Sequence, residues 1–399
     1  MSVVQTLNQH RSIFCIKLCI RYAVHICSRA IDWLTLSFLE GVGCALQNRL
    51  IKQYGSPEAI LAADDTVDPI LGSRTQTVIR DRNNQKQALE RAKRELDVLE
   101  RNHFFLLAQC CPLYPEELKN IADPPVLLYG AGEVACFKRP RVAIVGSRTA
   151  TSYGKRQGEA FGRDLARQGV CVVSGGAHGI DASAHTGALA GGGETICVFG
   201  CGIDVVYPKN HGQLYAHIRE KGALLSEFSL GSAPERFHFP MRNRIISGMS
   251  RGTVVVEASE KSGSLITARL ALDQGREVFA VPGRVDSLKS QGCHRLIQAG
   301  AYLVQNAEDV LQELRLGFGG LGSESPAEPS HEEGTDSLLL STRAQELLSY
   351  VEPYPLSIDA LGRLSGFSAR DIPGLLLELE LAGAIRQLPG QIYERIDTA

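Results

Sequence analysis

From Arg141 onward the chain alternates short apolar runs with segments of helical periodicity, and this alternation constrains the fold more than any other feature. The apolar runs are nearly continuous, and several of them end in glycine turns. Strands of this kind, separated by helices, pair in parallel within a sheet that is covered on both faces. Such a doubly wound α/β sheet binds ligands at the carboxyl ends of its strands. The predicted strands are RVAIVGS, VCVVSGG, ETICVFG, ALLSEF, GTVVVEAS, EVFAVPG and AYLV.

The region before this sheet is predicted to be helical. Two short helix patterns flank the tight turn at Gly41 and Gly43, which is typical of a helix-hairpin-helix or SAM-like unit. A plain helical hairpin also needs a glycine turn, so DNA binding by this unit stays one of two interpretations. Gln76 to Asn102 has the pattern of one charged amphipathic helix, which we interpret as a connector.

The end of the chain predicts a second, smaller domain after a linker. Residues 316–337 are rich in Gly, Ser and Pro and carry acidic residues without lysine or arginine, which is typical of a flexible linker. The following pattern of three helices and two strands, with a turn at Pro389-Gly390, is that of a winged helix. Its third helix is acidic, so we expect it to contact protein and not a DNA groove. The expected segments are an unassigned N-terminal extension (1–29), a helical SAM-like domain and connector (30–104), a core (105–315), the linker (316–337) and a winged-helix-like domain (338–399).

Composition limits the compartment and the kind of partner. The 399 residues carry a formal net charge of −2, so any nucleic-acid surface must be a local patch. Eleven cysteines without a C-x-x-C pair fit a reducing cytoplasm better than a disulfide framework, and they predict no metal site. The apolar start IFCIKLCIRYAVHICS is interrupted by Lys17, Arg21 and His25, so we expect no membrane span. Upstream sequence read from a misplaced start is an alternative for residues 1–29.

Two glycine turns at the carboxyl ends of predicted strands are candidates for phosphate contact. The turn GSRT, with Gly146, Ser147 and Arg148, enters a helix whose free N–H groups favour an anion, and the arginine adds a planar fork. The turn SGGAHGIDASAH contributes Gly175 and Gly176, which allow a close backbone approach. The glycines do not follow the G-x-G-x-x-G pattern of a dinucleotide fold, which argues against NAD.

Polar side chains near these turns have both a catalytic and a structural interpretation. His178 and Asp181 could form a base and its orienting group, but we favour a turn donor and a capping residue. Cys201 has no activating neighbour in the sequence and is interpreted as packing.

The segment RFHFPMRNRIISGMSRG is the densest basic feature. Aromatic rings interleaved with arginines suit single-stranded nucleic acid, although a helix that packs on a sheet would also use such phenylalanines. Downstream, EASEKSGSLITAR places a lysine in a glycine-serine turn but lacks the phosphate-loop pattern, so ATP hydrolysis has no support. The candidates from these two segments are Phe239, Arg242, Asn243, Arg244, Lys261, Ser262 and Gly263.

Taken in order, these motifs resemble the signatures of the DNA-processing protein A (DprA/Smf) family. The motifs are GSRTATSYG, SGGAHGIDASAH, FGCGIDVVYP, FPMRNRIISGMS, EASEKSGSLITA and VPG followed by QGCHRLIQAGA, between Tyr114 and Val304. The resemblance implies a cytoplasmic bacterial protein with a Rossmann-like core that binds single-stranded DNA, protects incoming DNA, forms a homodimer and helps to load the RecA recombinase in natural transformation. It implies that Arg148 and Lys261 contact DNA phosphates, with Arg242 to Arg244 near the same groove.

The family implies no catalytic residue, no metal and no cofactor. Two other classes stay open as alternatives. A nucleotide phosphoribohydrolase would use the same glycine turns, but its PGGxGTxxE pattern is missing. A transcription regulator would place the winged helix in a duplex groove, which the acidic third helix disfavours.

Overall fold

The computed structural model describes Ile26 and residues 29–63, 73–316, 341–351, 355–368, 370–388 and 390–395. The chain forms two compact units, Met1–Gly317 and Phe318–Ala399, which are described separately below. Most of the expected extension 1–29 and of the expected linker 316–337 lies outside the described residues. In the described part of the chain, no helix is long and apolar enough to cross a membrane.

The first unit is built on a nine-stranded sheet with the order β1-β2-β6-β5-β4-β3-β7-β8-β9. From β6 to β9 every neighbouring pair is parallel, while β1 and β2 form an antiparallel edge. The doubly wound α/β prediction is confirmed, since each predicted apolar run contains a strand. The strands are β1 Phe105–Ala108, β2 Leu127–Gly132, β3 Arg141–Val145, β4 Cys171–Ser174, β5 Thr195–Val198, β6 Ala223–Ser226, β7 Gly252–Val255, β8 Glu277–Ala280 and β9 Tyr302–Leu303.

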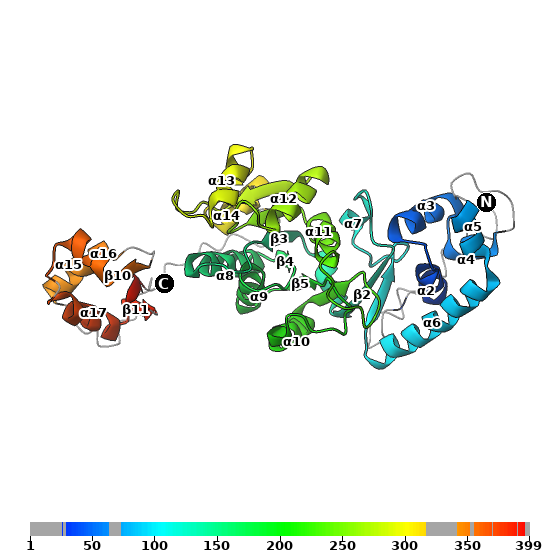
Figure 1. Ribbon diagram of the computed structural model, residues 1–399, viewed down its shortest axis with the longest axis horizontal. Coiled ribbons are helices and arrows are strands. Elements are labelled where there is room, and N and C mark those ends of the chain that lie inside the picture. The colour runs from blue at the N-terminus through cyan, green and yellow to red at the C-terminus, as the bar shows by residue number, and fades with distance from the viewer. Residues whose placement is uncertain are drawn as a thin grey trace, which may run out of the picture. The chain divides into compact units, whose positions relative to one another are not determined.

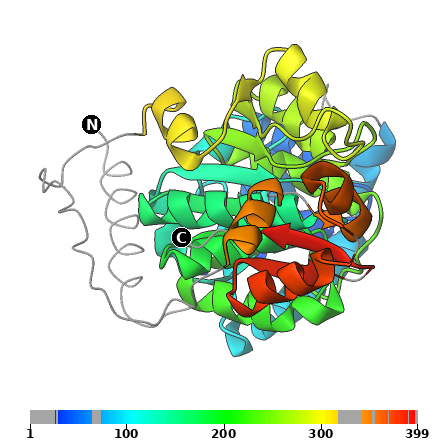
Figure 2. The same cartoon turned by 90° about the vertical axis from the view of Figure 1, so that its left-hand side faces the viewer.

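Helices cover both faces of this sheet (Figures 1 and 2). Alternate strand residues point to opposite faces, so Val173 packs with Ile245 on one face and Val172 packs with Phe161 on the other. One face carries α8 Ser152–Arg167, α9 Ile180–Ala190, α10 Gly212–Lys221 and α14 Ala307–Glu313. The other carries α7 Glu116–Lys119, α11 His238–Gly248, α12 Ser264–Asp273 and α13 Gln291–Gln298. Short 3₁₀ turns lie at η1 Val134–Lys138 and η2 Lys209–His211.

The N-terminal helices pack against the antiparallel edge of the sheet. Trp33 and Leu99 are buried together with Leu106 and Tyr129 of β1 and β2. The expected helical hairpin is present, with its turn between α2 and α3 at Gly41, where φ is +75°. The helices are α2 Ala30–Phe38, α3 Cys44–Tyr54, α4 Pro57–Ala62, α5 Ser73–Arg80 and α6 Arg82–Arg101.

The expectation of one connector helix from Gln76 to Asn102 is wrong. The helix is interrupted at Asp81, whose carboxylate caps α6 by accepting the Asn83 N–H at 2.9 Å. Nor is α6 only a connector, because Ala92 and Leu99 are buried together with Trp33 of α2. The helix therefore belongs to the core of the N-terminal region.

The second unit is the expected winged helix. Its strands form a three-stranded sheet in the order β10-β12-β11, and β10 is a short strand that the sequence pattern did not predict. Acidic residues of the third helix serve the unit itself: the Glu378 carboxylate accepts the Ser341 N–H at 2.6 Å, and Asp371 pairs with Arg343 at 2.9 Å. The elements are α15 Thr342–Tyr350, β10 Leu356–Ser357, α16 Ile358–Ser365, α17 Ile372–Leu381, β11 Ile385–Leu388 and β12 Ile392–Arg395.

Candidate nucleic-acid interface

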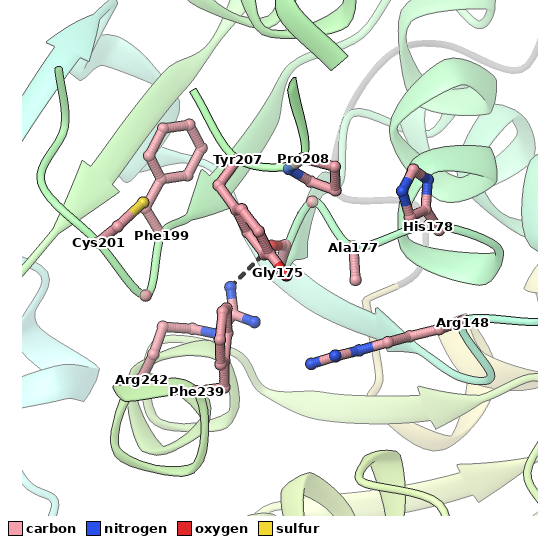
Figure 3. A pocket seen from close by; sticks show the side chains of 12 residues that line it. Arg148, Gly175, Ala177, His178, Phe199, Cys201, Tyr207, Pro208, Phe239 and Arg242 are labelled. Atoms are coloured by element: carbon pink, nitrogen blue, oxygen red, sulfur yellow. Dashed lines mark hydrogen bonds between the residues drawn. The ribbon is translucent and has the colours of Figure 1, made fainter. Parts of the chain in front are cut away.

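A pocket opens at the carboxyl ends of β4 and β5, where the doubly wound fold predicts a ligand site (Figure 3). Its walls come from the loops after β3, β4 and β5 and from the first turns of α11. It brings together five of the predicted site residues, Arg148, Gly175, Gly176, Phe239 and Arg242. The remaining lining residues are Ala177, His178, Phe199, Gly200, Cys201, Tyr207 and Pro208.

The Phe239 ring contacts two arginines and a tyrosine of the pocket. The guanidinium carbon of Arg148 lies 5.2 Å from the centre of that ring, and the guanidinium carbon of Arg242 lies 6.0 Å from it. The Tyr207 ring is tilted against it at 5.7 Å between centroids. Cations within about 6 Å of a ring are attracted by its negative face. The pocket therefore combines positive charge with two aromatic surfaces.

Arg148 is the exposed cation of this group. Within the described residues its guanidinium makes no hydrogen bond or ion pair, and it lies against the Phe239 ring. Because its five N–H donors are not used inside the protein, they are available to an anion.

Arg242, in contrast, is an internal residue with 4% of its surface exposed. It donates hydrogen bonds to the carbonyl oxygens of Gly175, at 2.7 Å, and of Val198. A side chain at Gly175 would not fit, because its Cβ would lie 2.5 Å from a terminal nitrogen of Arg242. The guanidinium thus ties the ends of β4 and β5 together. Arg242 lines the pocket as predicted, but at least two of its hydrogen bonds serve this internal role, and its contact with DNA stays a prediction.

Asp181 supports the same loop from the other side. Its carboxylate is buried and accepts the Ala177 N–H at 3.3 Å. Burial raises the pKa of this carboxyl, and the nearby Arg242 opposes that rise. Burial also lowers the pKa of Arg242, and Asp181 opposes this change. The capping interpretation of Asp181 is wrong, because the N-cap of α9 is Gly179 and Asp181 lies within the first turn of the helix, where its carboxylate holds the preceding loop.

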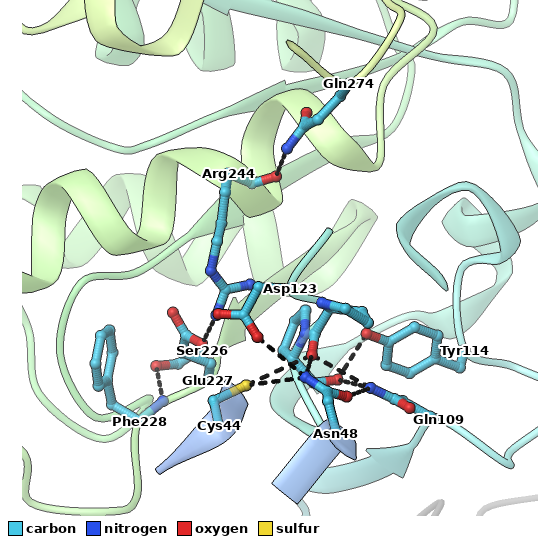
Figure 4. Close-up of polar contacts among 12 residues, drawn as sticks. Cys44, Asn48, Gln109, Tyr114, Asp123, Ser226, Glu227, Phe228, Arg244 and Gln274 are labelled. Carbon is cyan, nitrogen blue, oxygen red and sulfur yellow. Dashed lines mark hydrogen bonds and ion pairs between the residues drawn. The ribbon is translucent and has the colours of Figure 1, made fainter. Parts of the chain in front are cut away.

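Arg244 is not among the residues that line the pocket, and its contact with DNA stays a prediction. It forms an ion pair with Glu227 in which the two side chains are 11% and 7% exposed (Figure 4). Burial raises the pKa of Glu227 to about 7, and Arg244 opposes this rise. Between the two arginines, the amide oxygen of Asn243 accepts the Nε–H of Arg242 at 3.2 Å. Asn243 therefore supports Arg242.

The turn after β3 differs from the expected anion cradle. The Ser147 N–H is not free, because it donates to the Glu257 carbonyl oxygen at 2.7 Å. Helix α8 does not begin at Gly146 or Ser147 but at Ser152, with Thr151 as its N-cap. The Thr151 N–H lies 3.2 Å from a carboxylate oxygen of Glu257. The protein's own carboxylate occupies the position that we expected for a ligand anion.

Lys261, Ser262 and Gly263 form the loop between β7 and α12. The Lys261 side chain is exposed, and the Ser262 hydroxyl is bonded to that of Ser264 at 2.8 Å. Because β7 pairs with β3, this loop emerges at the same edge of the sheet as Arg148. None of the three lines the pocket, so their DNA contact stays a prediction.

The candidate catalytic groups are not arranged for catalysis. The His178 ring packs edge-on against His211 at 4.7 Å, and His211 bonds to the Gly176 carbonyl oxygen. Burial raises the pKa of Cys201 to about 11, so its thiol stays protonated at neutral pH. Among the described residues, no group of His, Cys, Asp and Glu is placed to hold a metal ion.

Tyr207 and Pro208 are among the pocket residues that sequence reasoning did not single out. Tyr207 and Pro208 follow the glycine turn after β5, in the motif that ends FGCGIDVVYP, and the tyrosine ring is 42% exposed. The next residue, Lys209, is also exposed and adds a positive charge beside the pocket wall. An aromatic residue and a lysine in the same loop as a glycine turn at a strand end were the available signal.

The comparisons with known proteins agree on one family. The model described as DNA recombination-mediator protein A matches residues 106–315, and the model of the DprA winged helix domain matches residues 325–391. Protein Smf of Escherichia coli is 41% identical over 293 residues, which cover 73% of this chain and 78% of that protein. Protein Smf of Synechocystis is 32% identical over 403 residues, covering 91% and 98%. The X-ray structure of DNA processing protein A from Streptococcus pneumoniae matches with a TM-score of 0.62 and 38% identity, covering 71% of this chain and 97% of that one.

Proposed function

This chain belongs to the DNA processing protein A (DprA/Smf) family, and we propose that it binds single-stranded DNA at the pocket around Phe239. DNA processing is what the names of its relatives state. The proposal adds the form of the DNA and the residues that hold it.

The observation that carries the proposal is the Phe239 ring, which lies within reach of Arg148, Arg242 and Tyr207. Proteins that bind single strands combine aromatic platforms for bases with cations that follow the backbone. Here the two rings offer faces to a base, and the unpaired Arg148 guanidinium offers a bidentate contact to a phosphate. Nearby, Phe237 is 62% exposed and can accept a neighbouring base.

The same features favour a single strand over a duplex. A base can stack on Phe239 or Tyr207 only when it has left its own stack, which a duplex resists by a few kcal/mol per base. The aromatic rings read no base edge, so little sequence preference is expected.

We propose that the protein makes and breaks no bond in the DNA. The His178 and Asp181 side chains are engaged in separate structural contacts, and Cys201 stays protonated. These contacts support a binding role over the phosphoribohydrolase alternative.

Several further roles are proposed from the family resemblance alone. They are protection of incoming DNA, assembly as a homodimer and help in loading the RecA recombinase during natural transformation. A cytoplasmic location is proposed as well, and the buried free thiols Cys171, Cys197 and Cys293 fit a reducing compartment. We keep as proposals the segment boundaries 30–104, 105–315 and 338–399.

Fluorescence anisotropy with labelled oligonucleotides tests the central proposal. We expect the purified protein to bind a single strand more tightly than the matching duplex, and mononucleotides to compete poorly. Affinity should fall as salt is added, because phosphate contacts release counterions. Phe239→Leu should weaken binding by about 1–3 kcal/mol, the usual cost of losing one stacked base. Preference for the duplex, or turnover of a mononucleotide, would contradict the proposal.

A further inference from the structure

The N-terminus of α8 holds a buried carboxylate. Glu257 follows β7 in the sequence and is 4% exposed. Its carboxylate oxygens lie 3.2 and 3.3 Å from the Thr151 nitrogen, and it also accepts the Thr151 hydroxyl proton. Within the described residues Glu257 forms no ion pair, so these hydrogen bonds and the helix dipole are what offset its charge.

This position has a defined use in doubly wound folds. The turn after the first central strand, at the N-terminus of the helix that follows, is where such folds place a nucleotide phosphate. A carboxylate and a phosphate use the same donors there. In this chain the Thr151 N–H serves the Glu257 carboxylate, and the Ser147 N–H serves the Glu257 carbonyl oxygen.

The Glu257 carboxylate lies against the first turn of α8. A Cβ added at Gly154, in the first turn of α8, would lie 2.6 Å from a carboxylate oxygen of Glu257. The sequence GSRTATSYG resembles part of a phosphate-binding turn. Its second glycine, Gly154, leaves space for the protein's own Glu257 carboxylate.

We propose that Glu257 is a specificity-determining residue, a built-in anion that closes the nucleotide-phosphate position of this fold. A free nucleotide, whose phosphate would need that position, is excluded. A nucleic-acid chain that lies across the neighbouring Arg148 pocket is not. Only the statement about the nucleic-acid chain rests on the proposed function. The exclusion of a free phosphate by Glu257 does not depend on it.

Glu257 also positions Arg148. It holds the loop on both sides of the arginine, at Ser147 through its carbonyl oxygen and at Thr151 through its carboxylate. The Lys289 ammonium braces the same loop by donating to the Thr149 carbonyl oxygen at 2.9 Å. The loop backbone is therefore fixed while the Arg148 guanidinium remains available.

Anion rescue of a Glu257→Ala variant tests the inference without DNA. The variant should melt at a lower temperature than the parent protein, because the α8 N-terminus loses its acceptor. Formate or inorganic phosphate should restore most of that loss, relative to chloride at the same ionic strength. Glu257→Gln, which refills the space, should not be rescued. Glu260→Ala removes an exposed acid three residues away whose surface ion pair with Arg295 contributes little to stability, so it should melt close to the parent in every salt.

A second measurement uses the native glutamate and guards against a variant that does not fold. Inorganic phosphate is titrated into the Arg148→Ala protein by calorimetry, where the pocket arginine can no longer hold it. We expect no saturable binding. Saturable binding there, or a Glu257→Ala melting temperature that ignores formate and phosphate, would overturn the inference. Failure of the parent protein to bind single strands would instead remove the proposed function and leave these results intact.

Discussion

Arg242 and Arg244 stand two residues apart on α11 and belong to different regions of the molecule. Residues two apart on a helix point to different sides, so Arg242 lines the pocket while Arg244 pairs with Glu227 beneath the N-terminal helices. Arg148, on another loop, is the cation that the pocket leaves available. The comparison between the pocket and the buried pair shows that the three arginines predicted to contact DNA hold three different positions, of which one has a guanidinium without an internal hydrogen bond in the described part of the chain.

The largest effect should come from breaking the buried pair. Arg244→Ala removes the cation of the buried Glu227, so that carboxyl must either stay charged without a partner or take up a proton; breaking a buried pair typically costs about 3–5 kcal/mol of unfolding free energy. Urea unfolding measures the loss. Replacing both partners, with Arg244→Met and Glu227→Leu, should recover much of it. The fraction that remains folded should bind single strands as the parent does. A selective loss of DNA affinity in Arg244→Ala would place Arg244 in the interface after all.

The second prediction uses pH to separate the two regions. The folded-state pKa of Glu227 is raised to about 7 from an ordinary value of 4.5. Between these values the folded protein binds more protons than the unfolded chain, so this residue's contribution to stability falls as pH rises from about 4.5 to 7. Unfolding of the parent and of Glu227→Gln at pH 5 and pH 8 should show that the substitution costs more at pH 5.

The pH dependence of the parent protein alone would not isolate Glu227, because His185 contributes a pH dependence of the opposite sign. Burial lowers the pKa of His185 to about 3, so the unfolded chain binds more protons than the folded protein between that value and 6.5. This contribution to stability rises with pH and opposes that of Glu227 in the parent protein. The difference between parent and Glu227→Gln cancels it. An equal cost of the substitution at both pH values would contradict the raised pKa.

Arg148→Ala should produce the reverse pattern, with affinity lost and stability kept. An exposed guanidinium without internal partners contributes little to folding. Loss of its charge-assisted contact to phosphate should weaken binding by about 1–3 kcal/mol. Anisotropy measures the affinity, and urea unfolding checks the stability. Arg167→Ala, which removes an exposed arginine at the far end of α8, is the matched control. Equal affinities for the two variants would remove Arg148 from the site.

The sequence predicts the sheet well because its signal is local. Each run such as TVVVE carries its own hydrophobic pattern, and the pairing of parallel strands follows from the helices between them. The break at Asp81 escaped notice because good helix formers stand on both sides of it. The signal fails where a partner is distant: the Arg244–Glu227 pair joins residues 17 apart, and Thr151 meets Glu257 across 106 positions. Charge is visible in a sequence, but whether it is already paired depends on the tertiary fold.

Lys261 gives the smallest expected effect and tests how far the interface extends beyond the pocket. It is exposed on the loop after β7. That strand pairs with β3, which leads into the Arg148 loop, but Lys261 does not line the pocket. A strand that follows the sheet edge in this direction would reach it with one phosphate. Lys261→Ala should then weaken binding by about 0.5–1.5 kcal/mol and lower the slope of affinity against salt by about one charge.

A variant with both Arg148→Ala and Lys261→Ala tests whether the two side chains contact separate phosphates. Contacts that share no partner have additive effects on affinity, within about 0.5 kcal/mol. Anisotropy at several salt concentrations should therefore show the losses of Arg148→Ala and Lys261→Ala summing in the double variant, with both slopes reduced. If Lys261→Ala changes neither affinity nor slope, the bound strand leaves the sheet edge before β7, and the interface is confined to the pocket around Phe239.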